Sequence, residues 1–331
     1  MIATYPMPCQ DKKISVGVIG LGWWGPKLLR NFLSHERVEG AVGCDTDEGR
    51  RWAVAQEYNI KTVGAVSTLV EDVPVDAVVI ATPPATHYEI AKLGLNHGKH
   101  ILLTKPPTLT LFELEDLVRI SEEKGLILML DSAFVYAPSV QKMKSLFEER
   151  SFPRPTSVHS YRHGNDLHYH NISRLQNTMF RNKIDVLDDL LFHDLALLTH
   201  LFKATFHLTS IRRFYNLNPV LCDTAFLELE SEHFPVHISL SWTLPERRRQ
   251  ILVFTRDQYL LFDDLREGGK LQLFEFETKS DTTILYEEKE PLFCEVDHFI
   301  TCLLNGKKPL TDGAFMLQVM EIYDQIRHAP K

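Results

Sequence analysis

Long apolar segments and basic clusters are missing from this sequence. No apolar run approaches the ~20 residues that a helix needs to cross a bilayer. The first twelve residues, MIATYPMPCQDK, lack the basic start and apolar stretch of a signal peptide, so we expect a loose leader there. The formal net charge is −8, with no long basic run, which argues against binding nucleic acid or an anionic membrane.

Cysteine is scarce and scattered. The cysteines form no C-x-x-C pair and are odd in number, so the sequence predicts neither a disulfide framework nor a zinc site. The five are Cys9, Cys44, Cys222, Cys294 and Cys302. Such thiols are typical of a reducing cytoplasm, where we expect the protein to work. Internal repeats and low-complexity tracts are also missing.

The sequence does contain enough apolar material for two cores. It has 331 residues, of which 44% are hydrophobic and 24% charged. This length exceeds that of an ordinary single core and predicts a soluble, globular protein of two domains. We place the domains at residues 12–136 and 137–331.

The first domain alternates short apolar runs with amphipathic stretches. The runs are rich in Val, Ile and Leu and hardly alternate with polar residues, as in strands buried on both faces of a parallel sheet. They cover residues 14–20, 38–45, 76–82, 100–106 and 126–133. Helices are indicated between them, one by Pro26 at a first helical position and one by a capping box of Thr110 and Glu113. The pattern predicts an α/β fold, a Rossmann domain of the dinucleotide-binding kind.

The pattern changes after Tyr136. Several apolar segments there alternate only partly with polar residues, which suits a sheet with one solvent-facing side. The expected elements are a helix over 138–149, a strand near 156–162, a long apolar helix near 185–202, β segments from 206 to 287, and helices near 293–304 and 313–327. The prediction is an α+β domain with a large, open, mostly antiparallel sheet.

A glycine-rich turn follows the first apolar run. Residues 18–25 read VIGLGWWG, and Gly20, Gly22 and Gly25 have the G-x-G-x-x-G spacing of a dinucleotide-binding turn between a strand and a helix. The first glycine allows the tight bend, the second lets the backbone approach the pyrophosphate, and the third lets helix and strand pack closely. Asp45 stands about 20 positions further on, where a carboxylate hydrogen-bonds the ribose 2′-hydroxyl and repels a 2′-phosphate. We therefore predict NAD as the cofactor and favour NADP less.

Two tryptophans fill the variable positions of this motif. Trp23 and Trp24 leave the phosphate contacts undisturbed, because backbone N–H groups make those contacts. Either tryptophan could line the nicotinamide side of the site or pack against the second domain, and the sequence leaves both open. A structural glycine turn without nucleotide is the competing interpretation of the whole motif.

A lysine stands at the end of the fourth apolar run, in HILLTKPP. Most such lysines are solvated surface charges. In open α/β sheets, however, ligands bind beyond the carboxyl ends of the strands. Lys105, fixed by the two prolines after it, could therefore protonate or hydrogen-bond a substrate oxygen.

At this point the sequence resembles the glucose–fructose oxidoreductase/inositol dehydrogenase/rhizopine-catabolism family (Gfo/Idh/MocA), from about Ile14 to at least His200. The resemblance rests on VIGLGWWGPKLLRNF, DAVVIATPPATHYEIAKLGLNHGKHILLTKP, LILMLDSAFVYAPSVQKMK and a D-x-x-x-H element from Asp189 to His193. The stretches GWWGPKLLRNF, FVYAPSV and FHDLALL look most like the branch that acts on nucleotide-linked sugars. That branch includes UDP-N-acetylglucosamine 3-dehydrogenases.

The resemblance implies an NAD(P)-dependent oxidoreductase whose open C-terminal sheet often mediates oligomerisation, hence a homodimer or homotetramer. Lys105 matches the lysine of the family's E-K-P motif, and Asp189 and His193 match its aspartate and histidine. The stretches that usually surround the nicotinamide ribose contain Thr82, Pro84, His87 and Thr104.

The sequence departs from the family pattern in three places, one of which is Leu191-Phe192, where the sugar-nucleotide branch often carries Ala-Pro. Thr104 replaces the E-K-P glutamate, and Asp131-Ser132 replaces the usual G-H before the aromatic stretch. Loss of the glutamate removes a negative charge beside Lys105. This should lower the lysine pKa, because an opposite charge favours the ammonium form.

The implied chemistry assigns roles to three residues. Oxidising a secondary alcohol removes a hydroxyl proton while hydride goes to the nicotinamide, so the protein must orient the substrate and move the proton. We expect His193 to be the acid/base, because imidazole titrates in the working pH range, and Lys105 to polarise the developing alkoxide. Asp189 lies four residues before His193 and could orient the imidazole or bind a sugar hydroxyl; a helix salt bridge is the alternative. The expected substrate is a sugar, nucleotide-linked, that reacts at a ring secondary alcohol.

Further polar residues are weaker candidates. The substrate-binding candidates are Tyr136, Arg162, His163 and Arg174. An arginine could bind a diphosphate or carboxylate bidentately, with surface charge as the alternative for each. His168 and His170 suggest a metal, but no third ligand stands at motif spacing, so we predict none. We expect the run at 247–249, three arginines, to be a solvated hairpin end.

Two other functions are compatible with the sequence. One is a dehydrogenase of free polyols or monosaccharides, of the inositol type. The other is a catalytically silent NAD-binding sensor of the same fold, which Thr104 favours and the retained Lys105, Asp189 and His193 oppose. Each requires a small-molecule ligand, with no nucleic acid and no membrane.

Overall fold

The computed structural model describes residues 12–149, 152–164, 179 and 183–330. Contacts divide the chain into two compact units, which are described separately: Met1–Ala133 with Glu290–Leu317, and Phe134–Lys289 with Gln318–Lys331. In the part of the chain that is described, no helix has both the length and the apolar character needed to cross a membrane.

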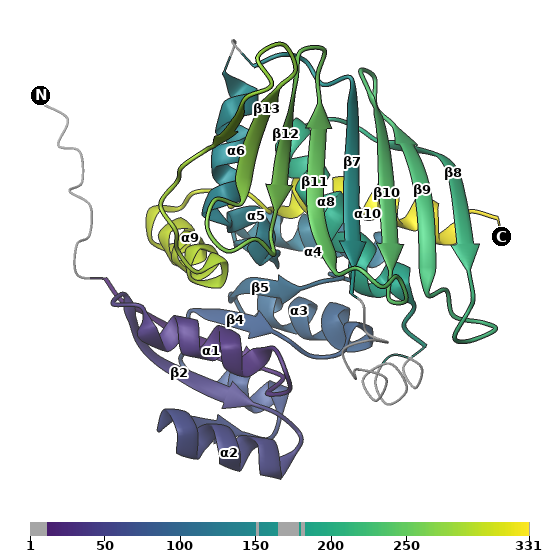
Figure 1. Ribbon diagram of the computed structural model, residues 1–331. Helices are drawn as coiled ribbons and strands as arrows, with labels where there is room; N and C mark the ends of the chain where they lie inside the picture. The colour runs from purple at the N-terminus through teal and green to yellow at the C-terminus, as the bar shows by residue number, and fades with distance from the viewer. Residues whose placement is uncertain (1–11, 150–151, 165–178, 180–182, 331) are drawn as a thin grey trace, which may run out of the picture. The chain divides into compact units, whose positions relative to one another are not determined.

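The first unit is built on a six-stranded sheet in the order β3-β2-β1-β4-β5-β6, and all of its neighbouring strands are parallel. The strands are β1 (Ile14–Ile19), β2 (Val38–Cys44), β3 (Lys61–Val63), β4 (Ala77–Ile80), β5 (His100–Thr104) and β6 (Leu128–Asp131). Their Val, Ile and Leu side chains are almost entirely buried, as expected for strands covered on both faces. The predicted Rossmann architecture is confirmed (Figure 1).

Helices connect these strands. They are α1 (Gly25–Ser34), α2 (Glu48–Tyr58), the π-helical turn η1 (Thr68–Asp72), the 3₁₀ turn η2 (Pro84–Thr86), α3 (His87–Asn96) and α4 (Leu111–Lys124). The predicted capping box is present: the Glu113 N–H donates to Thr110 Oγ1 at 3.3 Å, and the Thr110 N–H donates to Glu113 Oε2 at 3.2 Å. Helix α4 therefore begins where the sequence indicates.

A late segment of the chain returns to the first unit. Helix α9 (Pro291–Asn305) packs Phe299 edge-on against Phe32 of α1, with ring centroids 6.1 Å apart. The Leu130 N–H in β6 donates to the carbonyl of Thr311 at 2.9 Å. The contact division therefore differs from the single boundary expected after residue 136, because the apolar face of α9 completes the first core.

The second unit is built on an eight-stranded sheet in the order β14-β13-β12-β11-β7-β10-β9-β8. The strands are β7 (Ser157–His163), β8 (His207–Phe214), β9 (Thr224–Glu230), β10 (Pro235–Ser241), β11 (Arg248–Phe254), β12 (Gln258–Asp263), β13 (Leu271–Glu275) and β14 (Asp281–Thr283). Only β7 and β10 pair in parallel. The prediction of a large, mostly antiparallel sheet is confirmed.

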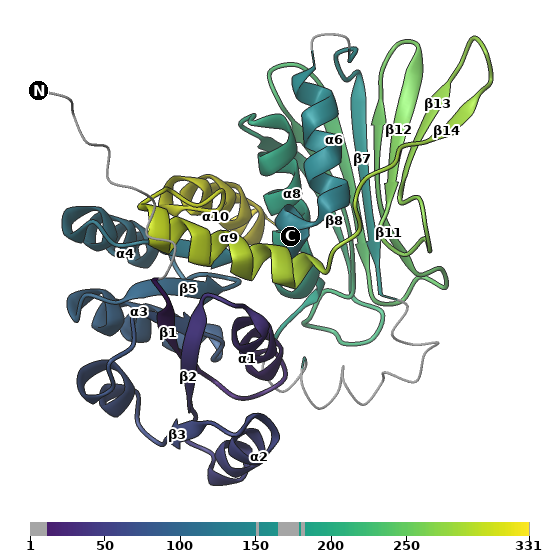
Figure 2. The ribbon, with the colours of Figure 1, turned by 90° about the vertical axis from the view of Figure 1, so that its left-hand side faces the viewer.

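Helices cover one face of this sheet. The helices of the second unit are α5 (Ala133–Tyr136, of which Ala133 is counted with the first unit), α6 (Pro138–Glu148), a π-helical turn η4 (Leu187–Leu191), α8 (Phe192–Phe202) and the second half of α10 (Gly313–His328). Figure 2 shows α6 and α8 on the same side of the strands, and no helix of the described residues covers the other side. The strands alternate accordingly: Val253 and Leu260 are fully buried toward the helices, and Tyr259 points away from them.

Candidate functional site

The glycine-rich turn joins β1 to α1 in the first unit. Gly20 has φ +91°, and a Cβ there would come within 2.5 Å of the Ala81 carbonyl oxygen. A Cβ on Gly25 would come within 1.9 Å of the Gly20 carbonyl oxygen, whereas one on Gly22 would meet nothing within 4 Å. The first and third glycines therefore shape the turn, and the second leaves its backbone open to a ligand. No side chain caps the first turn of α1 and that turn holds no acidic residue, so its N-terminus suits an anion.

Asp45 closes the turn from the end of β2. Its Oδ2 accepts a hydrogen bond from the Leu21 N–H at 2.8 Å, and its Oδ1 accepts one from the Asp47 N–H at 2.9 Å. The side chain is buried, and an Arg50 guanidinium nitrogen lies 3.6 Å from Oδ2. The carboxylate is thus held rigidly beside the glycines, with the Arg50 guanidinium next to it.

The two tryptophans of the motif have different surroundings. Trp23 is 82% exposed, and the Lys27 ammonium lies 3.9 Å from the centre of its ring. Trp24 is half-buried and donates its indole N–H to Asp131 Oδ2 at the end of β6. Trp24 therefore connects the turn with the carboxyl end of another strand of the same sheet.

A buried histidine supports the loops after β4 and β5. His87 is fully buried at the start of α3, with Nε2 2.8 Å from the Thr82 carbonyl oxygen and Nδ1 2.9 Å from that of Pro106. The Thr104 hydroxyl lies 3.4 Å from Nε2. Burial lowers the pKa of His87, although its bonds to carbonyl oxygens oppose the change. His87 thus fixes the loop that carries Lys105, whose side chain is partly exposed; Pro84 opens the turn η2 just before it.

A pair of acids lies at the same edge of the sheet. Asp131 and Glu295 are 5% and 0% exposed and hydrogen-bond to each other. Burial, followed by the Asp131 charge, raises the pKa of Glu295 well above its usual range. Burial also raises the pKa of Asp131, while Glu295, Trp24 and the positive charge of Lys105 oppose that rise. Sequence reasoning noted Asp131 only as a departure from the family pattern and missed Glu295.

In the second unit, Asp189 and His193 lie on one continuous helical segment formed by η4 and α8. The helix predicted at 185–202 is present, but its first turn is π-helical, a form that is frequent at functional sites. The fully buried Trp242 donates its indole N–H to Asp189 Oδ2 at 3.1 Å. The His193 ring is partly exposed and packs edge-on against Phe134, with centroids 5.2 Å apart.

The residue after His193 fixes α8 to the sheet. Asp194 accepts a hydrogen bond from Arg162 Nε at 2.6 Å and one from the Ser160 hydroxyl at 2.5 Å, and all three side chains are buried. The surface-charge alternative for Arg162 is therefore wrong. The inward positions of β7 carry this arginine beneath the helix, where Asp194 neutralises it.

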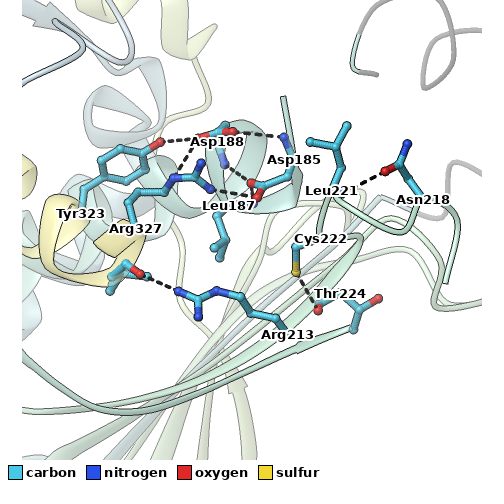
Figure 3. Close-up of polar contacts among 11 residues, drawn as sticks. Asp185, Leu187, Asp188, Arg213, Asn218, Leu221, Cys222, Thr224, Tyr323 and Arg327 are labelled. Carbon is cyan, nitrogen blue, oxygen red and sulfur yellow. Dashed lines mark hydrogen bonds and ion pairs between the residues drawn. The ribbon is translucent and has the colours of Figure 1, made fainter. Parts of the chain in front are cut away.

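A second network holds the start of the same helix (Figure 3). Arg327 of α10 donates to Asp185 Oδ2 at 2.8 Å and lies 3.3 Å from Asp188 Oδ1, which also accepts a hydrogen bond from the Tyr323 hydroxyl at 2.7 Å. The Asp188 N–H donates to Asp185 Oδ1 at 3.1 Å, so one carboxylate caps the turn. Burial and the neighbouring Asp188 raise the pKa of Asp185. The network anchors the turn that presents Asp189.

The other substrate candidates have mixed surroundings. Tyr136 is buried in α5. His163 is also buried; its Nε2 lies 2.8 Å from the Ser239 hydroxyl, and burial lowers its pKa to about 4. Arg174, His168 and His170 lie outside the described residues, within which no group of three metal-ligating side chains gathers.

Arg249 is a site residue that the sequence analysis missed. It is the second residue of β11 instead of lying in a solvated hairpin end, and it is half-buried. Its guanidinium carbon lies 6.0 Å from the Phe134 ring that also contacts His193, and that of Arg162 lies 4.9 Å from the same ring. Burial, followed by the charge of Arg162, lowers the pKa of Arg249. The sequence signal for this placement was the spacing of Arg249, Ile251 and Val253. Residues two apart on a strand share a face, and the last two are buried.

Comparison with known proteins matches residues 14–132 to the Gfo/Idh/MocA family, described as an oxidoreductase family with an NAD-binding Rossmann fold. The UDP-N-acetylglucosamine 3-dehydrogenase of Acidithiobacillus ferrooxidans is 24% identical over 323 residues, which cover 95% of this chain and 96% of that protein. The 2,7-anhydro-N-acetylneuraminate hydratase of Escherichia coli is 27% identical over 151 residues. That second match covers 46% of this chain and only 40% of the hydratase.

Solved structures share the fold of the whole chain. A structure of the Acidithiobacillus enzyme matches with a TM-score of 0.79 at 23% identity, covering 95% of this chain and 97% of that one. A 3-ketoreductase from Actinomadura kijaniata, in complex with TDP-benzene and NADP, matches with a TM-score of 0.81 at 15% identity, covering 96% and 98%. Residues 14–132 are therefore similar to the Gfo/Idh/MocA family of oxidoreductases, and the chain shares its fold with these solved structures.

Proposed function

We propose that this protein is a nicotinamide-dependent dehydrogenase that moves hydride to or from a ring secondary alcohol of a nucleotide-linked sugar. The observation that carries the proposal is the similarity to a UDP-N-acetylglucosamine 3-dehydrogenase over 95% of this chain. That similarity extends over both units, and so over the glycine-rich turn as well as the helix with His193. A match confined to the Rossmann fold would support cofactor binding alone.

The residues of the first unit fit a dinucleotide. The open backbone at Gly22 and the N-terminus of α1 would hold the pyrophosphate, and the Asp45 carboxylate would bind the adenosine ribose. Thr82 follows β4 and Thr104 is the last residue of β5, so both lie at the strand ends where the nicotinamide end of such a ligand binds in open α/β sheets. When bound, the nicotinamide supplies the hydride acceptor or donor.

The proton is handled by the chain's own residues. His193 removes the hydroxyl proton during oxidation and returns it during reduction, because an imidazole can do both near neutral pH. Asp189 lies on the same helical segment as His193, and its carboxylate accepts a hydrogen bond from the Trp242 indole. From there it orients the His193 imidazole or binds a sugar hydroxyl. Lys105 acts electrostatically, because its ammonium group stabilises the negative charge that develops on the substrate oxygen.

We propose NAD as the preferred cofactor. A 2′-phosphate would approach the Asp45 carboxylate, and like charges repel. Arg50, 3.6 Å from that carboxylate, offsets part of the repulsion, so some use of NADP is expected.

Turnover with a panel of substrates tests the function. UDP-, GDP- and dTDP-sugars, inositols and free hexoses are mixed with NAD or NADH, and nicotinamide absorbance is followed for wild type, Lys105→Ala and His193→Ala. We expect turnover of a nucleotide sugar, lost in both variants while NADH binding is retained. Turnover of free polyols alone would support the inositol-type alternative, and binding without any turnover would support a sensor.

We also propose a homo-oligomer formed through the face of the second sheet that the described helices leave uncovered. Phe254, Tyr259, Phe274 and Phe276 form a row of ring contacts on strands β11 to β13 and just beyond, with neighbouring centroids 5.2 to 6.1 Å apart. Phe276 is 42% exposed. Light scattering of wild type and Tyr259→Glu tests the surface, and an unchanged mass in the variant would refute it.

A further inference from the structure

Asp131 lies next to the strand end that carries Lys105. In the parallel pair of β5 and β6, Thr104 is the register partner of Asp131, and Lys105 directly follows Thr104. The Asp131 side chain is 5% exposed and accepts the Trp24 indole N–H. Thr104 has a hydroxyl group and no charge. The carboxylate at this edge of the sheet is therefore that of Asp131, on the neighbouring strand β6.

Glu295 reaches the same point from α9. Its side chain is fully buried on the apolar face of the helix, and Oε1 accepts the Ser132 N–H at 2.5 Å. Its other oxygen, Oε2, is buried and meets no hydrogen-bond donor among the described residues. A buried ionised carboxylate without a donor is strongly disfavoured, so the hydrogen bond between the two acids requires a shared proton.

The surroundings determine which acid keeps the proton. Burial raises the pKa of Asp131, but Glu295, the Trp24 N–H and the positive charge of Lys105 all oppose that rise and favour the ionised form. Among the described residues Glu295 accepts one backbone N–H, and burial together with the Asp131 charge raises its pKa well above the usual range. Glu295 is therefore the protonated partner and donates to Asp131, and this bond stabilises the Asp131 carboxylate.

We propose that Asp131 provides the negative charge that faces Lys105, and that neutral Glu295 and Trp24 hold this charge in place. The proposal rests on the role given to Lys105 above and assigns Asp131, Glu295 and Trp24 as positioning residues. The groups that face Asp131 come from β5 (Thr104 and Lys105), from the start of α1 (Trp24) and from α9 (Glu295). The charge keeps Lys105 in the ammonium form, which can stabilise a substrate alkoxide.

The proposal makes opposite predictions for two isosteric variants. Asp131→Asn removes the charge and keeps the shape. Glu295→Gln mimics the protonated acid, because its amide can still donate to Asp131 and accept from Ser132. The Lys105 pKa is measured by NMR of ¹³C-methylated lysines in the full chain, with Lys105→Arg to assign the signal. We expect Asp131→Asn to lower this pKa by about one unit or more, a roughly tenfold weaker proton affinity, and Glu295→Gln to leave it unchanged. No change in Asp131→Asn, or an equal fall in Glu295→Gln, would overturn the proposal.

A second measurement does not depend on the lysine or on correct folding of Asp131→Asn. Infrared spectroscopy of wild type at neutral pH should show the carbonyl band of a buried protonated carboxylic acid, and Glu295→Gln should lose it. If the band is missing from wild type or survives in Glu295→Gln, the assigned protonation is wrong.

The pH profile of turnover separates this proposal from the proposed function. Asp131→Asn should move the alkaline limb of kcat/KM to lower pH, and Glu295→Gln should leave it in place. If Lys105→Ala turns over a substrate as fast as wild type while the lysine pKa still responds to Asp131→Asn, the role of Lys105 fails and the electrostatic pairing stands. If the Lys105 pKa does not change in Asp131→Asn, the electrostatic pairing of Asp131 with Lys105 is refuted, whatever the activity of the variants.

Discussion

Two alanine substitutions in the glycine-rich turn should act on different properties: one should lower the stability of the fold, and the other should weaken cofactor binding. A Cβ at Gly25 would lie 1.9 Å from the Gly20 carbonyl oxygen, and since ordinary contacts begin near 3.4 Å, the two backbones would have to separate by about 1.5 Å. We expect Gly25→Ala to cost about 3 kcal/mol of unfolding free energy, at the upper end for overpacking. For a unit of this size, this corresponds to a fall in melting temperature of about 6–12 °C.

Gly22→Ala is the matched variant. Its Cβ would meet no atom of the chain within 4 Å, so unfolding free energy should stay within about 0.5 kcal/mol of wild type. The same methyl group would occupy the space that a pyrophosphate needs to reach the backbone, so NADH affinity should fall about 30-fold, or about 2 kcal/mol. Calorimetric melting and NADH fluorescence titration measure the two quantities. Unchanged NADH affinity in Gly22→Ala would refute the assignment of the pyrophosphate site, and unchanged melting of Gly25→Ala would refute the packing argument.

Three further outcomes are expected. Asp194→Asn leaves the Arg162 guanidinium buried without its counter-charge and should cost about 3 kcal/mol in urea unfolding; a loss below about 1 kcal/mol would contradict the buried ion pair. Asp45→Ala should raise the ratio of kcat/KM with NADP to kcat/KM with NAD by about tenfold or more, and Arg50→Ala should lower this ratio. Equal ratios in wild type and both variants would refute the proposal that Asp45 binds the adenosine ribose. Burial lowers the pKa of His200 to about 4, so its stabilising effect is complete above pH 6.5 and is lost as the pH falls toward 4, by about 2 kcal/mol between pH 7 and 5. The unfolding free energy should therefore change less between pH 7 and pH 5 in His200→Gln than in wild type. An equal change in both proteins would show that His200 does not cause the loss of stability.

The elements that build the Rossmann core could be predicted from the sequence because their signals are local. Buried parallel strands leave continuous runs of Val, Ile and Leu, and the capping box of Thr110 and Glu113 marks the start of α4 within four residues. β3 (Lys61–Val63) and η1 escaped prediction because segments of three to five residues carry too little periodicity.

Polar partnerships distant in sequence could not be predicted. Arg162 was compatible with surface charge because its partner Asp194 lies 32 residues away on α8, and no periodicity joins an arginine on a strand to an aspartate on a helix. Ser132 and Glu295 are separated by 163 residues. The substitution at Asp131 was visible in the sequence, but its meaning depended on a partner that only the fold brings near.

The return of α9 to the first unit affects the order in which the chain can fold during synthesis. Residues up to 133 leave the ribosome without Glu295 and without Phe299, the aromatic partner of Phe32. Until the strands between β7 and β14 have been made, the nascent Rossmann core exposes the apolar surface of α1 and a carboxyl group that lacks its proton-sharing partner. We therefore expect a fragment that ends at residue 133 to expose apolar surface and to need chaperones or a separately supplied α9 segment to fold. In this protein the N-terminal core becomes complete only after all eight strands of the second sheet have been translated.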